Sequence, residues 1–123
     1  MNLHVYSFEK LETWQKAKEL AKAIYDVTEH FPNREKFGLT QQMRRCAISI
    51  ASNIAEGSAR KTSKDKAHFT TIAYGSLMEL LNQIIIAYEL HYILETDYQN
   101  IRSQVQKVSY MLNALRNSQT PPP

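Results

Sequence analysis

The residues that most often carry acid–base or metal chemistry are scattered along this chain. The four histidines are His4, His30, His68 and His91, and no two of them are four residues apart, the spacing at which one helix face can hold zinc. A di-iron site inside a helix bundle requires two Glu-x-x-His pairs, and the sequence has none. We therefore predict no metal site.

Nucleophilic and phosphate-binding chemistry also lack their usual residues. Cys46 is the single cysteine, so it has no partner for an internal disulfide. Arg44 and Arg45 lie close enough to lower a thiol pKa, but the residue sits among alanine and isoleucine with no identifiable base, which favours a small packed side chain. The three glycines are isolated and form no phosphate loop. We predict a protein without catalytic residues or cofactor.

Positive charge is concentrated in one segment. Residues 34–66 carry eight lysines and arginines against three acidic residues, a net charge of +5, whereas the whole chain has +3. Phosphate backbones are bound by repeated cations of this kind. The candidate nucleic-acid-binding residues are Arg44, Arg45, Arg60, Lys61, Lys64 and Lys66. The alternative is a solvated basic loop that only keeps the protein soluble.

A polar ridge is predicted on the helix that contains Cys46. Arg45, Ser49, Ser52 and Glu56 follow at spacings of four, three and four and so share one helix face, flanked by Asn53 and ended by Gly57. Glu56 can pair with Arg45 of a neighbouring copy or with Arg60. We interpret these residues as a subunit contact, with a ligand or nucleic-acid role as the alternative.

The same helix predicts assembly. Between Cys46 and Ala55 it has no Lys, Arg, Glu, Gln or Asp, the residues that normally cover the wet face of a surface helix. The apolar residues of 84–94 lie all around their helix axis and do not form a single stripe. One four-helix core cannot easily absorb this surface, so we expect contacts between subunits. The alternative is a tightly packed monomer.

Periodicity and capping residues predict an all-α fold. Glycine and proline are too scarce for the turns of a many-stranded β protein. Helices are expected over about 7–30, from Thr40 to Gly57, from Thr62 to about Leu94, and from Thr96 onward. Thr40 is a possible N-cap, Thr62 and Thr96 each open a capping box, and Gly57 can end its helix in the left-handed conformation. The last carries a heptad seam at Ile101, Val105, Val108, Leu112 and Leu115.

The short connections predict an antiparallel up-down-up-down four-helix bundle as one domain over residues 1–117. Residues 118–123 are expected to form a disordered, proline-rich tail. The apolar run that starts at Ile84 stops at Glu89, far too short to span a membrane, and no basic segment with an apolar run follows the first residue. We expect a cytoplasmic protein without a membrane partner.

Several short motifs carry a resemblance to a known family. They are Phe8-x-x-Leu11-x-x-Trp14, Phe31-Pro32, Glu35-x-Phe37-Gly38-Leu39, Gln42-x-Arg44-Arg45, Ser49-Ile50, Asn53-Ile54-Ala55-Glu56-Gly57 and Gly75-Ser76-Leu77-x-Glu79-Leu80. Together they resemble the bacterial four-helix bundle family, also called the S23 or 23S rRNA intervening-sequence protein family. Cys46 departs from the alanine of many relatives.

The resemblance implies a ring-shaped homopentamer of four-helix subunits. Some relatives are encoded within insertions of 23S rRNA genes, and a related protein is the basic accessory factor of diversity-generating retroelements, which associates with a reverse transcriptase and nucleic acid. Two functions remain: a nucleic-acid-associated accessory factor that presents the repeated cations to RNA or DNA, and a scaffold whose ring binds another protein.

Overall fold

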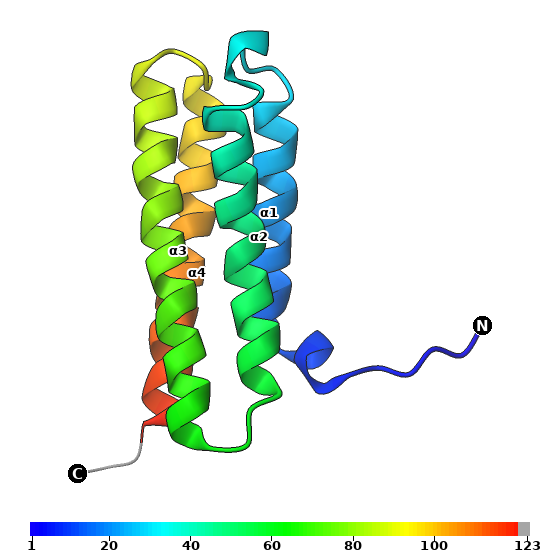
Figure 1. Ribbon diagram of the computed structural model, residues 1–123. Helices are drawn as coiled ribbons and strands as arrows, with labels where there is room; N and C mark the ends of the chain where they lie inside the picture. Colours follow the sequence, from blue (N-terminus) through cyan, green and yellow to red (C-terminus); the bar gives the residue numbers. More distant parts are fainter. Residues whose placement is uncertain (121–123) are drawn as a thin grey trace.

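The protein is a bundle of four long helices. The computed structural model describes residues 1–120, and over that range the α-helices are α1 (Glu12–Thr28), α2 (Leu39–Ser58), α3 (Ser63–Glu89) and α4 (Glu95–Gln119). Two short 3-10 helices, η1 (Ser7–Lys10) and η2 (Asn33–Glu35), precede α1 and α2. Successive helices run in opposite directions, and α4 returns to pack on α1 (Figure 1). The predicted all-α, up-down-up-down bundle is confirmed.

The core is built from one buried stripe on each helix. In α1 the buried residues Ala17, Leu20, Ala21 and Ile24 recur at spacings of three, one and three, as a helix with one inward face requires. In α4 the predicted seam is buried at Ile101, Val105, Val108 and Leu112, while Leu115 is half-buried. The 3.6-residue periodicity of the sequence therefore identifies the core correctly.

The first helix is shorter than predicted. Leu11 has an extended backbone, with φ −72° and ψ 120°, so the chain turns there instead of forming one helix from Ser7. The turn is held by the Gln15 side chain, which donates to the Glu9 carbonyl at 2.8 Å, and by Phe8, whose ring lies 4.9 Å from that of Trp14. These contacts fold η1 back onto the side of the bundle.

The predicted extent of α2 is right to within one residue at each end, but the roles predicted for Thr40 and Gly57 are wrong. Thr40 is not the N-cap: it is buried inside the helix, which begins at Leu39, and the Glu35 carboxylate accepts the Leu39 N–H at 3.2 Å instead. Gly57 does not end the helix in a left-handed conformation, since it lies within α2 and no glycine among residues 1–120 has a positive φ.

Gly57 is required for packing. A Cβ atom built on it would lie 2.8 Å from the Cβ atom of Phe69 on α3, closer than real Cβ atoms approach one another. The absence of a side chain at this position therefore lets the end of α2 lie directly against the start of α3.

The remaining boundaries are partly as predicted. Thr62 caps α3 as expected, accepting the Asp65 N–H at 3.1 Å. The helix stops at Glu89, five residues earlier than predicted, because the chain turns at His91, which has φ 65°. The next helix already begins at Glu95, so the predicted N-cap at Thr96 is wrong.

The end of the domain lies slightly beyond its predicted boundary at residue 117. Because α4 continues to Gln119, the prediction of a disordered tail is wrong for Ser118 and Gln119. The last three residues of that tail, 121–123, lie outside the described residues. Within the described range, none of the helices has both the length and the apolar content needed to cross a membrane.

Candidate nucleic-acid interface

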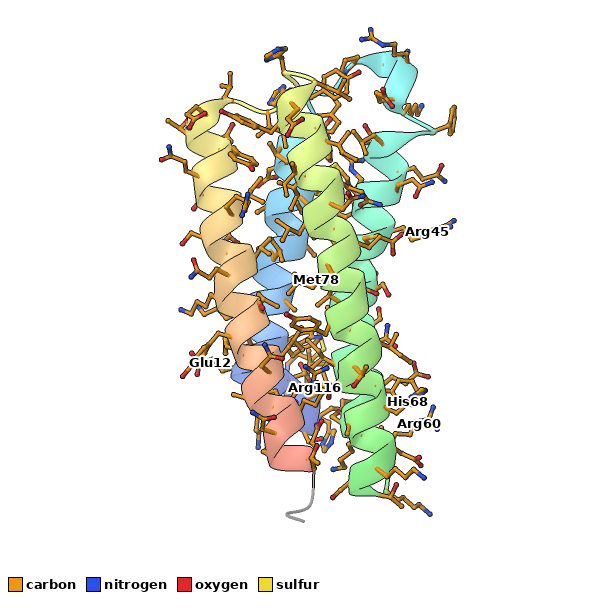
Figure 2. All side chains as sticks on the ribbon, turned by 90° about the vertical axis from the view of Figure 1, so that its left-hand side faces the viewer. Glu12, Arg45, Arg60, His68, Met78 and Arg116 are labelled. Atoms are coloured by element: carbon orange, nitrogen blue, oxygen red, sulfur yellow. The ribbon has the colours of Figure 1, made fainter. Side chains whose placement is uncertain are left out.

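Four of the six predicted nucleic-acid-binding residues lie together at one end of the bundle. We call Arg60, Lys61, Lys64 and Lys66 the basic end; they follow one another through the α2–α3 loop into the first turn of α3. The first three are exposed and Lys66 is half-buried. In Figure 1 this loop lies at the bottom of the bundle, and Figure 2 shows Arg60 there.

Backbone hydrogen bonds and a helix cap hold the basic end in place. The Ala59 and Arg60 N–H groups bond to the carbonyls of Glu56 and Gly57, at 3.2 and 3.1 Å, which closes α2 without a left-handed residue. Two residues later the Thr62 cap opens α3. The N–H groups of the first turn of α3 and its helix dipole add partial positive charge beside Lys61 and Lys64, which the exposed Asp65 of the same turn partly offsets.

The four cations differ in their partners. Arg60 is held by its own chain: its guanidinium lies 3.4 Å from the Glu56 carboxylate and 4.5 Å from the centre of the Phe69 ring. Among the described residues, none of Lys61, Lys64 and Lys66 has a carboxylate within 4.0 Å. The three lysines are therefore the cations of this end that have no acidic partner in the described chain.

Arg44 and Arg45 lie elsewhere. Arg44 cross-links α2 to the end of α1, where it donates to the Thr28 hydroxyl at 2.9 Å and pairs with Glu29 at 3.3 Å. Its guanidinium also stacks on Tyr25, 4.6 Å from the ring centre. Arg45 is exposed on α2, roughly four turns before Arg60. The structure thus divides the predicted set into a basic end, a structural arginine and a separate exposed one.

The predicted polar ridge lies on the outer side of α2. Ser49 is half-buried and its hydroxyl lies 3.0 Å from that of Ser76 on α3, which ties the two helices together. Asn53 is half-buried and donates to the Ser49 carbonyl at 2.8 Å. Ser52 and Glu56 are exposed. Glu56 pairs with Arg60 of its own chain, one of the two partners predicted for it. Ser49 and Asn53 thus have roles inside one chain.

Cys46 is buried in the core, and this burial sets its chemistry. Burial raises the pKa of its thiol, and the neighbouring Glu79 carboxylate raises that pKa further, outweighing Arg45. The thiolate is the reactive form, so a raised pKa lowers reactivity near neutral pH. The structure therefore assigns Cys46 to packing.

We expect Cys46 to react with iodoacetamide at pH 8 at least about tenfold more slowly in the native protein than in denaturant, because both burial and the raised pKa withhold the thiolate. Mass spectrometry of time points follows the reaction, with free cysteine as the reference. Equal rates with and without denaturant would contradict the assignment. Since the pKa is raised and not lowered, the rate of native labelling should still be rising with pH where the rate for free cysteine has already levelled off.

Sequence reasoning missed an apolar groove on the side of the bundle. The α1–α2 groove has a volume of about 560 Å³ and lies between the outer faces of α1 and α2. It is lined mainly by aromatic and small apolar side chains, with lysines and one aspartate at its edge: Phe8, Trp14, Lys18, Ala21, Lys22, Tyr25, Asp26, Ile48, Ala51, Ser52 and Ala55. The signal was the small-sided stretch of α2, which contributes Ile48, Ala51, Ser52 and Ala55 to this groove.

Potential metal ligands are dispersed over the described chain. Across residues 1–120, no three His, Cys, Asp or Glu side chains are close enough together to hold a metal ion. The short bond between Tyr88 and Glu95 raises the pKa of the tyrosine and lowers that of the carboxylate. This pair lies at the junction of α3 and α4 and ties the two helices together.

Comparison with known proteins gives a consistent result. Residues 9–114 match the family described as 23S rRNA-intervening sequence protein. Among solved structures, the chain is similar to a protein of unknown function from the S23 ribosomal protein family of Bacteroides thetaiotaomicron, with a TM-score of 0.79 and 22% identity. That similarity covers 85% of this chain and 95% of the other. No curated protein matches the sequence.

Proposed function

Because the chain belongs to the 23S rRNA-intervening sequence protein family, we propose that it is a non-enzymatic accessory protein that assembles into a homopentameric ring and associates with nucleic acid through its repeated basic end. The chemistry proposed is contact with phosphates, not recognition of bases. Such contact is largely independent of sequence and requires cations that are not already neutralised.

The observation that carries the proposal is that three lysines of the basic end have no acidic partner among the described residues. Lys61, Lys64 and Lys66 have no carboxylate within 4.0 Å among the described residues, and they lie beside the positively polarised start of α3. Arg60 adds a fourth cation whose orientation is fixed by Glu56 and Phe69. One backbone strand that passes this end would meet several cations within a few residues of each other.

Assembly would multiply this site. A single basic loop on a chain of net charge +3 gives only weak phosphate binding, but identical loops on one ring act together, since each contact raises the effective concentration of the next. Exposed apolar side chains on several helices, such as Ile48, Ile72 and Ile86, support contacts between copies. The number five rests on the family resemblance.

A second candidate function is a scaffold that binds another protein. It is favoured by the opposite end of the bundle, where Phe37, Leu90 and Leu94 are exposed at 81%, 48% and 72%. These residues come from the two connections at the top of Figure 1, before α2 and between α3 and α4. Exposed apolar groups in such loops suit a protein partner better than a phosphate backbone.

The proposal is tested by binding of the purified, nuclease-treated protein to labelled structured RNA and to duplex DNA over a salt series. Native mass is recorded in the same buffers. We expect an oligomer whose affinity falls steeply as salt rises, because each phosphate contact releases counterions. An intact oligomer that binds neither probe at low salt would overturn the accessory function and leave the scaffold.

A further inference from the structure

The first six residues leave the bundle as a free arm. We call residues 1–6 the arm; in Figure 1 it runs outward from η1, away from the four helices. Its apolar side chains are exposed, with Leu3 at 74% and Val5 at 51%. Apolar side chains held away from their own core gain nothing from folding, so a surface outside the bundle that covered them would stabilise the arm.

The arm has two different faces. In an extended segment, successive side chains point to opposite sides, so Met1, Leu3 and Val5 share one side and Asn2, His4 and Tyr6 the other. The structure agrees with this alternation, because the rings of His4 and Tyr6 are in contact, with 4.6 Å between their centres. One face of the arm is therefore apolar throughout, as in a strand that lies on an apolar floor.

The direction of the arm is fixed at its base. The Tyr6 N–H donates to the Glu9 carboxylate at 2.7 Å, and the Glu9 N–H donates to the Tyr6 carbonyl at 3.1 Å. These two hydrogen bonds close one turn and hold the base of the arm against η1. Phe8, which lies within that turn, lines the α1–α2 groove and packs against Trp14. Figure 1 shows the arm running outward from the helices that form the groove of its own chain.

The α1–α2 groove matches the arm in length and character. Between Trp14 and Tyr25 it runs for about 16 Å along α1, and six extended residues reach at most about 20 Å. Its floor contains Ile48, which is 46% exposed, and the small residues Ala51 and Ala55. The small side chains of the groove leave room for larger side chains of a second segment. The arm has such larger side chains.

We propose that the arm of one copy binds along the α1–α2 groove of a second copy, with Met1, Leu3 and Val5 facing the floor. The contact is head-to-tail, because the arm and the groove are different surfaces of the same chain. Such contacts close into rings when the rotation between copies allows it. The arm would thus link each subunit to the next.

This inference rests on the self-association included in the proposed function, but it needs no nucleic acid. Its direct test is disulfide trapping in the full chain, with Cys46→Ala as background. The first variant, which we call the trap, carries Val5→Cys on the arm and Ser52→Cys in the groove. The control variant carries Val5→Cys with Gln106→Cys, because Gln106 is an exposed residue of α4 that does not line the groove.

Mild oxidation of the trap should give covalent dimers and larger species in at least about tenfold higher yield than the control, because a disulfide forms only between cysteines held within about 7 Å. A disulfide within one chain, a yield equal to the control, or a monomeric wild-type chain would each overturn the proposal. Covalent oligomers from a protein that binds no nucleic acid would support the arm contact while overturning the proposed function.

A second pair of variants separates this contact from a general effect of the arm. Leu3→Ser with Val5→Ser changes the apolar face, and Asn2→Ser with His4→Ser changes the other. The first pair should raise the dissociation constant for self-association at least about tenfold, and the second should leave it within about threefold of wild type. Equal effects of the two pairs in analytical ultracentrifugation would overturn the assigned face.

Discussion

The triple variant Lys61→Gln, Lys64→Gln, Lys66→Gln is expected to bind structured RNA or duplex DNA at least about 100-fold more weakly than the wild-type protein in 0.1 M salt. These lysines have no carboxylate partner among the described residues, so their charges are free to neutralise phosphates. The slope of log affinity against log salt should also become shallower by about two to three, one step for each lost phosphate contact.

The control for this variant removes the same charge elsewhere. Lys16→Gln, Lys36→Gln, Lys107→Gln also eliminates three positive charges, on α1, before α2 and on α4, and should keep most of the affinity. Both variants are compared at equal native mass. Similar losses in the two would show that overall charge, and not the basic end, determines binding.

Gly57→Val is expected to lower the free energy of unfolding by about 2–3 kcal/mol, a typical cost of overpacking. A Cβ atom at this position would lie 2.8 Å from the Cβ of Phe69 and 3.5 Å from the Lys66 carbonyl. Neither is the end of a flexible side chain, so α2 and α3 must separate. Because this contact also orients Arg60 and the α2–α3 loop, the variant should disturb the basic end.

Gly75→Val is the matched control. Gly75 also lies inside a helix, but a Cβ atom there would meet nothing within 4 Å, so the substitution should change stability by at most about 0.5 kcal/mol. Chemical denaturation of both variants at one protein concentration measures the difference, because the stability of an oligomer depends on concentration. Equal stabilities would contradict the close approach of the helices at Gly57.

The fold was predictable because it depends on patterns that are local in sequence. The seam from Ile101 to Leu112 and the cap at Thr62 are each written within a few neighbouring residues. The helix ends were less predictable, because glycine is used both at left-handed turns and where two helices touch. At Gly57 the packing use is shown by Phe69, a residue of the next helix that lies against it.

The candidate site was predicted in part for a similar reason. Arg60, Lys61, Lys64 and Lys66 are close in sequence and remain close in the fold. Arg44 belongs to the same basic segment, but its partners Thr28 and Glu29 come from the preceding helix. Charge counting along the chain does not reveal such pairing, so it overestimated the number of free cations.

The most direct test of the basic end is to map where nucleic acid touches the protein. The wild-type oligomer is cross-linked by ultraviolet light to a structured RNA at low salt, and the modified peptides are located by mass spectrometry. The basic end predicts that modifications concentrate in peptides covering residues 59–69. Bound RNA whose cross-links fall instead around Phe37 and Leu94, at the opposite end of the bundle, would contradict it.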